Sequence, residues 1–303
     1  MNFVLVWILS WLVLWTGQSS EPQTFRIATF NLENYLIEPS GTRSVKPLAA
    51  REQVVRDLTL LRPDVVAVQE MGPPAALEEL QQRLRAAGVN LPHLEHVRGW
   101  DTNIFVAVLS RFPFTARRSH SNDAFLLAGR RFHMSRGIVE VEIEANARTR
   151  FTLLAAHLKS KRQTGSADEA DLREAEAKVL RSHIDAALSR DPQGSVVVCG
   201  DFNDQRNSKP LRLILSRGRQ GLIDTHPSER RCDGSPSIDD GKRRVMWTHY
   251  YAAEESYTRL DYILLGRGMA SRWVPSGSYV LSSPGWGTGS DHRPVVCEFS
   301  LTE

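Results

Sequence analysis

Residues 195–204, Ser-Val-Val-Val-Cys-Gly-Asp-Phe-Asn-Asp, decide how the rest of the chain is interpreted. Four small or β-branched apolar residues are typical of a buried strand, and a glycine followed by polar residues ends that strand abruptly. In an extended chain Asp201 and Asn203 point to one side and Phe202 to the other. A carboxylate beside an amide can hold a water by its proton and a phosphoryl oxygen by a hydrogen bond, as hydrolysis of a phosphate ester requires. Most such tetrads are only turns, so this stretch alone leaves both interpretations open.

The chain begins with an apolar run of thirteen residues, Phe3 to Trp15, followed by small and polar residues. This length suits the hydrophobic region of a signal peptide and is short for a bilayer span of about twenty residues. We therefore expect residues 1–20 to direct export to the periplasm or the medium. An uncleaved membrane anchor stays open, because no Lys or Arg precedes the run and the best small-x-small cleavage site, residues 17–19, is not Ala-x-Ala.

Composition limits the class of protein only loosely. A chain of 303 residues with 41% apolar residues can form one large domain or two ordinary ones. Its 38 basic and 35 acidic residues give a net charge of +3, which is compatible with a polyanionic substrate but does not demand a nucleic acid. The cysteines, Cys199, Cys232 and Cys297, fit no zinc spacing, and two of them lie in apolar runs. We expect no disulfide framework.

Strands and helices alternate along the rest of the chain without an internal linker. Apolar runs and alternation predict strands at 25–30, 65–68, 104–109, 137–143, 151–156, 195–200, 259–265 and 294–301. Helical spacing predicts helices at 49–61, 75–87 and about 168–188. Polar segments rich in Gly, Pro and Ser predict loops at 38–47, 226–244 and 275–290. Because the alternation runs twice, we expect one α/β domain with two similar halves.

Polar side chains stand where many of these strands end. They are Asn31, Glu70, His157, Asp201 with Asn203, Asp261, and Asp291 with His292. Taken singly, each can be a purely structural residue: a turn residue, a helix cap, a satisfied core histidine, or an ion-pair partner, as Asp261 is for Arg259. Chance accounts for the whole set less well, because acids, amides and imidazoles occupy six strand ends while the strand interiors stay apolar.

Six ordered motifs resemble those of the endonuclease/exonuclease/phosphatase superfamily, the DNase I-like metal-dependent phosphoesterases. The motifs are Thr29-Phe30-Asn31, Val68-Gln69-Glu70, Ala156-His157-Leu158, Gly200-Asp201-Phe202-Asn203, Arg259-Leu260-Asp261-Tyr262 and Ser290-Asp291-His292-Arg293-Pro294. The resemblance runs from Phe25 to Leu301 and implies that residues 21–303 form one catalytic domain. The implied fold is a four-layer α/β/β/α sandwich, in which two mostly antiparallel sheets pack face to face between helices. The implied active site lies at one edge of the sheets.

The same resemblance implies a part for each motif residue. Glu70 would be the principal ligand of Mg²⁺, or of Mn²⁺, with Asn31 close to both metal and phosphate and Asp291 nearby. One or two carboxylates suffice for a hard cation that keeps several waters. Asp201 would orient or deprotonate the attacking water, and Asn203 would hold a nonbridging oxygen of the substrate.

The two motif histidines would donate to the phosphate or protonate the leaving oxygen. Asp261 would stand behind His292 and favour its charged form. His157 would be the second donor; abasic-site endonucleases of the superfamily usually carry Tyr at this place, whereas DNase I-like and sphingomyelinase-like members carry His. Basic residues near the motifs suit phosphate contacts, although most basic loop residues are only solvated. They are Lys159, which we expect to bind substrate, and Lys161, Arg162, Arg206 and Lys209.

These observations predict an exported, Mg²⁺-dependent phosphodiesterase. The first hypothesis is a nuclease that cleaves DNA or RNA without strong sequence preference. Phospholipase C-type hydrolysis of a lipid headgroup and a small-molecule phosphatase are alternatives, and the loop that carries Trp286 suits either a nucleic acid or a membrane. A binding module that has lost its chemistry belongs to another class, and the complete set of motif side chains speaks against it. No protein partner is implied, and we expect a monomer.

Overall fold

The computed structural model of the chain describes residues 24–163, 165, 167–231 and 244–302. The expected export signal, Cys232 and most of the loop predicted at 226–244 lie outside the described residues. Within these ranges no helix combines the length and apolarity needed to cross a membrane. Cys199 and Cys297 are buried and free, as expected of thiols in apolar strands.

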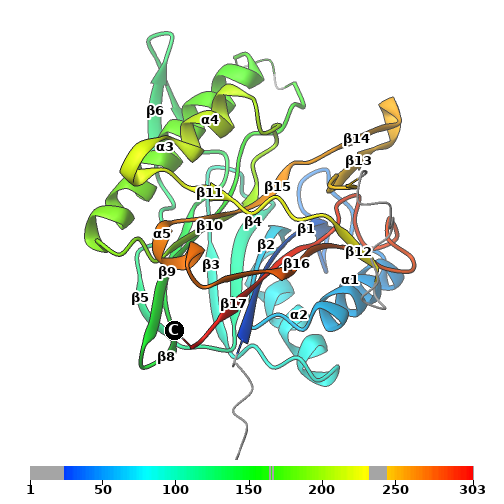
Figure 1. Ribbon diagram of the computed structural model, residues 1–303. Coiled ribbons are helices and arrows are strands. Elements are labelled where there is room, and N and C mark those ends of the chain that lie inside the picture. Colours follow the sequence, from blue (N-terminus) through cyan, green and yellow to red (C-terminus); the bar gives the residue numbers. More distant parts are fainter. Residues whose placement is uncertain (1–23, 164, 166, 232–243, 303) are drawn as a thin grey trace, which may run out of the picture.

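Two sheets lie face to face at the centre of the molecule (Figure 1). The first contains, in spatial order, β12 (Glu229–Arg231), β16 (Trp273–Ser282), β17 (Val295–Ser300), β1 (Thr24–Tyr35), β2 (Val65–Met71), β4 (Phe105–Ser110) and β3 (His93–Val97). The second contains β11 (Ile223–Asp224), β15 (Asp261–Leu265), β10 (Val196–Asp201), β9 (Thr149–His157), β8 (Val139–Asn146) and β5 (Phe114–Arg117). Two hairpins stand apart from the sheets: β6 (Ala124–Leu127) with β7 (Arg130–His133), and β13 (His249–Tyr251) with β14 (Ser256–Thr258).

Helices cover the outer faces of both sheets (Figure 1). The first sheet packs against α1 (Leu48–Leu61) and α2 (Pro74–Ala86), and the second against α3 (Glu169–Arg190) and α4 (Lys209–Leu215). The short helix α5 (Arg267–Ala270) and two 3₁₀ turns, η1 (Gly218–Gln220) and η2 (Ala252–Glu254), complete the elements. The expected four-layer α/β/β/α sandwich is confirmed.

The sequence of each central strand explains why it is buried on both faces. In β1, Phe25 and Ile27 point into the core between the sheets, whereas Ala28 and Phe30 point into the core under α1 and α2. Strand β10 divides its apolar run between the inner core and the core under α3 in the same way. An apolar run is therefore required in β10, because neither face of that strand meets water, whereas β1 accommodates part-exposed Arg26 through its ion pair with Glu298.

Most neighbouring strands are antiparallel, but the centre of each sheet holds a parallel pair. These pairs are β1 with β2 and β9 with β10, and a helix, α1 or α3, lies between the two strands of each pair in the sequence. Among the described strands, β12 with β16 is the remaining parallel pair. The doubled alternation in the sequence thus corresponds to one β–α–β unit in each sheet, and the carboxyl ends of the parallel strands lie together at a sheet edge.

Several predicted boundaries differ from the structure. Strand β1 continues past residue 30 to Tyr35, and β12 (Glu229–Arg231) lies within the loop predicted at 226–244. The loop expected at 275–290 is wrong in its first half, because β16 continues to Ser282 and pairs there with β17. Residues 279–281 of β16 are buried, and this burial favours a strand over the loop that Pro275 and Gly277 suggest. The strand expected from residue 259 begins at Asp261.

Candidate active site

The six polar strand ends meet at one edge of the two sheets. Asp201, the last residue of β10, lies opposite His157 in the parallel pairing with β9 and opposite Asp261 in the antiparallel pairing with β15. Asn31 and Glu70 come from the parallel pair of the other sheet, β1 and β2. The parallel pairs thus bring side chains far apart in sequence to one place, as the motif positions predict.

The carboxylate of Asp201 is the centre of this arrangement, and the residue is only 1% exposed. Its Oδ2 accepts a hydrogen bond from Asn31 Nδ2 at 3.0 Å and lies 3.5 Å from His157 Nε2 and 3.8 Å from His292 Nε2. Its Oδ1 accepts from the backbone N–H of Asn203 at 2.8 Å. Burial raises the pKa of Asp201, although the charge of His292 opposes the rise. A carboxylate with a raised pKa is a better proton acceptor than an exposed one.

His292 and Asp261 form a buried pair. His292 Nδ1 lies 2.8 Å from Asp261 Oδ2, and the Asp261 N–H donates to Thr248 Oγ1 at 3.1 Å. Burial alone would lower the pKa of His292, but the charge and hydrogen bond of Asp261 outweigh it and raise that pKa. The ring is therefore charged at neutral pH, and its Nε2 remains to face Asp201. Arg259, the alternative partner of Asp261, pairs with Asp224 instead, at 2.9 Å.

His157 is the neutral member of the pair of imidazoles. Burial, followed by the charge of Arg136, holds its pKa well below the ordinary value. Its Nδ1 is buried and has no hydrogen-bond partner, so the ring proton belongs on Nε2, which faces Asp201. Asn203 has a left-handed backbone, with φ of 52°, and its amide donates to the Leu158 carbonyl at 3.0 Å. The same amide donates to Asp201 Oδ2 at 3.4 Å, so both of its hydrogens have partners within the protein.

The carboxyl groups of Glu33, Glu70 and Asp291, here called the acidic group, lie at the other end of the site. Glu70 is also left-handed, with φ of 55°; its Oε2 accepts from the Asn34 N–H at 3.0 Å and its Oε1 lies 3.5 Å from Asn31 Nδ2. Burial raises the pKa of Glu33, and the charges of Asp291 and Glu70 raise it further. For Asp291, burial is outweighed by the hydrogen bond with His249 and the charge of His292, so its pKa is lowered.

This acidic group fits a hard divalent cation. Three carboxylates crowd together with one ammonium, that of buried Lys46, whose Nζ donates to the Glu33 carbonyl at 2.9 Å. Their mutual repulsion is what a bound cation would relieve, and oxygen donors are those that Mg²⁺ prefers. Glu70, Asp291 and Asn31, the expected ligands, would hold the ion together with Glu33; their part as ligands stays a prediction.

Two tighter groups of metal-type side chains in the site both include His292. Ligand atoms of His249, Asp291 and His292, and those of Asp201, Asp261 and His292, lie within 4.8 Å of one another. The Nδ1 of His292 is engaged by Asp261, and its ring is charged. A charged imidazole has no lone pair to offer a metal, so the acidic group suits a cation better than either of these.

Sequence reasoning missed Glu33, Lys46, Thr248 and His249. Glu33 stands two residues after Asn31 on the same strand, a spacing that could have identified it. His249 gave a weaker signal, because it lies in a three-residue strand; its ring centroid is 4.5 Å from that of His292, and its Nε2 is 3.6 Å from Asp291 Oδ2.

The structure does not bring the predicted basic residues into the same cluster. Lys159 Nζ donates to the backbone carbonyls of Ser160 and Arg162, at 3.2 and 2.8 Å, so the expected contact of Lys159 with substrate stays a prediction. Arg206 pairs with Asp224 at 3.0 Å, and Lys209 lies 3.7 Å from Glu174.

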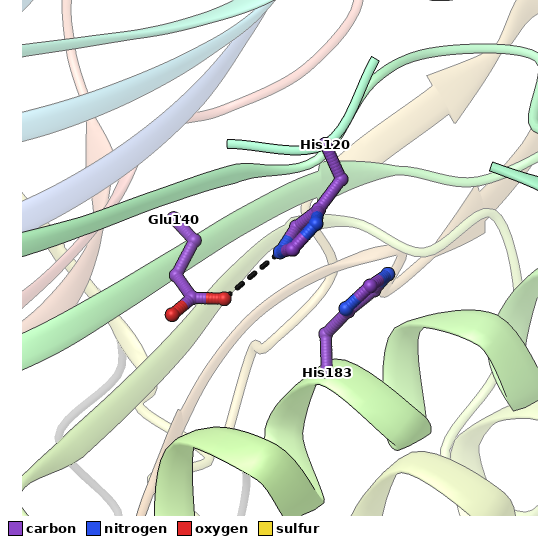
Figure 2. Close-up of side chains that lie close together, drawn as sticks. All are labelled: His120, Glu140 and His183. Carbon is purple, nitrogen blue, oxygen red and sulfur yellow. Dashed lines mark hydrogen bonds and ion pairs between the residues drawn. The ribbon is translucent and has the colours of Figure 1, made fainter. Parts of the chain in front are cut away.

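A further group of metal-type side chains lies away from the active-site edge, between β8 and α3 (Figure 2). His120 Nε2 lies 2.9 Å from Glu140 Oε2, and the rings of His120 and His183 are stacked with centroids 3.6 Å apart. Glu140 also pairs with Arg190, and His183 Nε2 lies 2.7 Å from Asp123 Oδ2. Because each ring is already hydrogen-bonded to a different carboxylate, we interpret this group as structural, although its ligand atoms lie within 4.8 Å of one another.

The chain belongs to the endonuclease/exonuclease/phosphatase family, whose family model matches residues 28–292. Members of this family hydrolyse phosphoester bonds and usually depend on a metal ion. No curated protein sequence gives a significant match.

Solved structures confirm the fold. The human nocturnin catalytic domain with a bound sulfate anion has a TM-score of 0.62 at 18% identity, with 92% of this chain and 95% of that chain covered. Truncated TDP2 from Caenorhabditis elegans has a TM-score of 0.60 at 14% identity, covering 92% and 98%. Sphingomyelinase C from Streptomyces griseocarneus has a TM-score of 0.61 at 20% identity, covering 92% and 100%. At these identities the likeness concerns the fold alone.

Proposed function

We propose that this protein is a Mg²⁺- or Mn²⁺-dependent phosphodiesterase, and that it cleaves DNA or RNA without strong sequence preference. The observation that supports the proposal best is the buried Asp201 carboxylate, which Asn31, His157 and His292 surround beside an acidic group. It combines a base of raised pKa, a charged donor and a neutral donor within one site.

In the proposed reaction Asp201 orients the attacking water and accepts its proton at Oδ2. The charged ring of His292 stabilises negative charge on the phosphoryl oxygens from Nε2 and gives a proton to the leaving oxygen as its bond to phosphorus breaks. Asp261 keeps the ring charged and correctly oriented, and the proton taken up by Asp201 can restore the ring afterwards. The neutral ring of His157 offers a second N–H from Nε2. Glu70, Asp291, Asn31 and Glu33 would hold a divalent cation, which would supply polarisation of a phosphoryl oxygen and offset charge in the displacement.

An activity panel tests this proposal. It compares plasmid DNA, single-stranded oligonucleotides, sphingomyelin, inositol phosphates and a simple diester, each with Mg²⁺ and with EDTA. We expect metal-dependent cleavage of the nucleic acids, and expect Asp201→Asn to remove it. Greatest activity on sphingomyelin would favour a phospholipase C-type enzyme, and greatest activity on inositol phosphates a small-molecule phosphatase. Inactivity on every substrate would favour a binding module.

We also propose that residues 1–20 direct export and that the mature chain is a periplasmic or secreted monomer. The apolar run from Phe3 to Trp15 supports export. After expression in a bacterium, N-terminal sequencing should find a chain that begins near residue 20. An intact Met1 in the membrane fraction would establish an anchor instead, and sedimentation of the purified chain tests the monomer.

A further inference from the structure

Aromatic side chains gather beside the active-site edge, on and next to the β13–β14 hairpin, which projects from the body of the molecule (Figure 1). We call Trp247, Tyr250, Tyr257 and Trp286 the aromatic cluster. The ring centroid of Trp247 lies 4.8 Å from that of Tyr257 and 5.0 Å from that of Trp286, and Tyr250 lies 4.7 Å from Tyr257. Tyr257 is 54% exposed. The cluster therefore presents aromatic surface to solvent.

The backbone fixes the aromatic cluster relative to the catalytic residues. The Tyr250 N–H donates to the Asp291 carbonyl at 3.0 Å, and Trp247 immediately precedes Thr248, which accepts from the Asp261 N–H. A short β-bridge joins His249 to His292. The cluster and the catalytic edge are thus neighbouring parts of one rigid arrangement.

Part of the aromatic cluster borders a hollow of about 400 Å³. Its lining includes Trp247, Tyr257 and three consecutive loop residues, Gln205, Arg206 and Asn207. Gln205 is two residues beyond catalytic Asn203, a reach of at most roughly 7 Å along an extended chain. A group in the hollow is therefore close enough to belong to the substrate whose phosphate meets Asp201.

The charge of the hollow suits a polyanion. Arg206 and Arg259 both line it, and both pair with the single carboxylate of Asp224, at 3.0 and 2.9 Å. Two guanidinium groups facing one carboxylate leave one positive charge in excess. The side chain of Arg206 is 56% exposed, so it can reach a phosphate.

We propose that this hollow is a base-binding subsite, which stacks an unpaired base of single-stranded nucleic acid next to the phosphate that is cleaved. Aromatic rings stack on any base, and the amides of Gln205 and Asn207 can bond to base edges. A base inside a duplex has both faces covered and cannot enter without unstacking. The hollow is concave and combines aromatic side chains with the charged side chains of Arg206 and Arg259, whereas membrane insertion requires a protruding apolar surface. The inference rests on the proposed nuclease function and adds a preference for single strands.

Two tyrosines of one hairpin give a matched test. Tyr257 lines the hollow, whereas Tyr251 is 48% exposed on the partner strand and does not line it. We expect Tyr257→Ala to weaken binding of a labelled single-stranded oligonucleotide in EDTA by roughly 5- to 100-fold, the effect of losing one base–aromatic stack. Tyr251→Ala should leave that affinity unchanged within about twofold. Gln205→Ala, at a surface loop, is a second variant of the hollow with little risk to folding.

An oligomer of abasic sugar-phosphate units separates base stacking from phosphate contacts. With Mg²⁺, Tyr257→Ala should slow cleavage of the single-stranded oligonucleotide and leave cleavage of the abasic oligomer unchanged. Equal losses on both substrates, or no loss on either, would overturn the subsite. Loss of binding to sphingomyelin vesicles without loss of oligonucleotide binding would overturn it in favour of a membrane surface. Failure of the wild-type protein to cleave any nucleic acid would refute the proposed function, while binding in EDTA still tests the subsite.

Discussion

The pairing of Asp261 with His292 gives the sharpest prediction about the active site. Asp261→Asn, His292→Ala and the double variant should lose kcat/KM by similar factors. Asp261 is fully buried and its Oδ2 lies 2.8 Å from His292 Nδ1, so the carboxylate has no solvent to replace the ring as a partner. If the carboxylate acts only through the imidazole, removing it costs nearly as much as removing the ring, and removing both costs little more.

The geometry sets the size of the effect. Two unit charges about 4 Å apart attract each other by about 4 kcal/mol at an effective dielectric constant of ~20. If the charged ring of His292 attracts the negative charge on a phosphoryl oxygen in this way, loss of the attraction corresponds to a rate factor of roughly 10³. We therefore expect each single variant, and the double variant, to lose about two to three orders of magnitude, within the range usual for acid–base groups.

The assay is hydrolysis of a simple diester at saturating Mg²⁺, with a thermal melt of each variant to confirm folding. Glu140→Gln is the matched control, because the buried carboxylate of Glu140 pairs with the half-buried ring of His120 at nearly the same length, 2.9 Å, outside the site (Figure 2). This control should lower Tm but leave kcat/KM within about twofold. Multiplicative losses in the cycle, roughly 10⁴ or more in the double variant, would refute the reasoning and assign the two residues separate tasks.

Three further predictions concern the metal, the core and the helix layer. Glu70→Gln should remove nearly all activity with an unchanged Tm, because the cation site has few protein ligands; an unaltered Mg²⁺ titration of the residual activity would contradict the assignment. Gly200→Ala should lower the free energy of unfolding by more than about 3 kcal/mol in urea, since φ is +135° there and a Cβ would lie 1.9 Å from the Ala156 carbonyl oxygen; a wild-type denaturation midpoint would contradict this. Burial raises the pKa of Asp57 above 3.8, so the native state holds the proton more tightly and stability falls as pH rises from about 4 through the native pKa. Asp57→Asn should make that fall shallower in urea unfolding measured from pH 4 to 7, because Asp64 and Glu176 also have raised pKa values and keep part of it; a variant with the full wild-type slope would show that Asp57 does not contribute.

The local sequence pattern was sufficient to predict a strand wherever that strand is buried on both faces. The apolar run of β10 and its abrupt polar end identify both the strand and Asp201, and Phe202 packs outward on Tyr262 as alternation requires. Strand β16 was missed because residues 275–278, Pro-Ser-Gly-Ser, interrupt its apolar residues, and its pairing with β17 decides the conformation. A pattern of single residues cannot reveal such a long-range pairing.

The functional residues that were missed depend on tertiary structure in the same way. Glu33 lies beyond residue 30, where alternation stops predicting a strand, but β1 continues to Tyr35 beside β2. His249 reaches the site through a three-residue strand. Lys159 shows the converse: its nearness to His157 in sequence fixes its position but not the direction of its side chain, and its ammonium is held by backbone carbonyls.

The left-handed backbone at Glu33, Glu70 and Asn203 places conformational strain on residues of the candidate active site. Side chains with a Cβ adopt this conformation at a cost of roughly 1 kcal/mol or more, which glycine avoids. If a mutant library were selected for thermal stability alone, glycine would therefore be enriched at these positions. The selected variants would be more stable but inactive. Any effort to make this protein more heat-resistant must select for turnover together with survival.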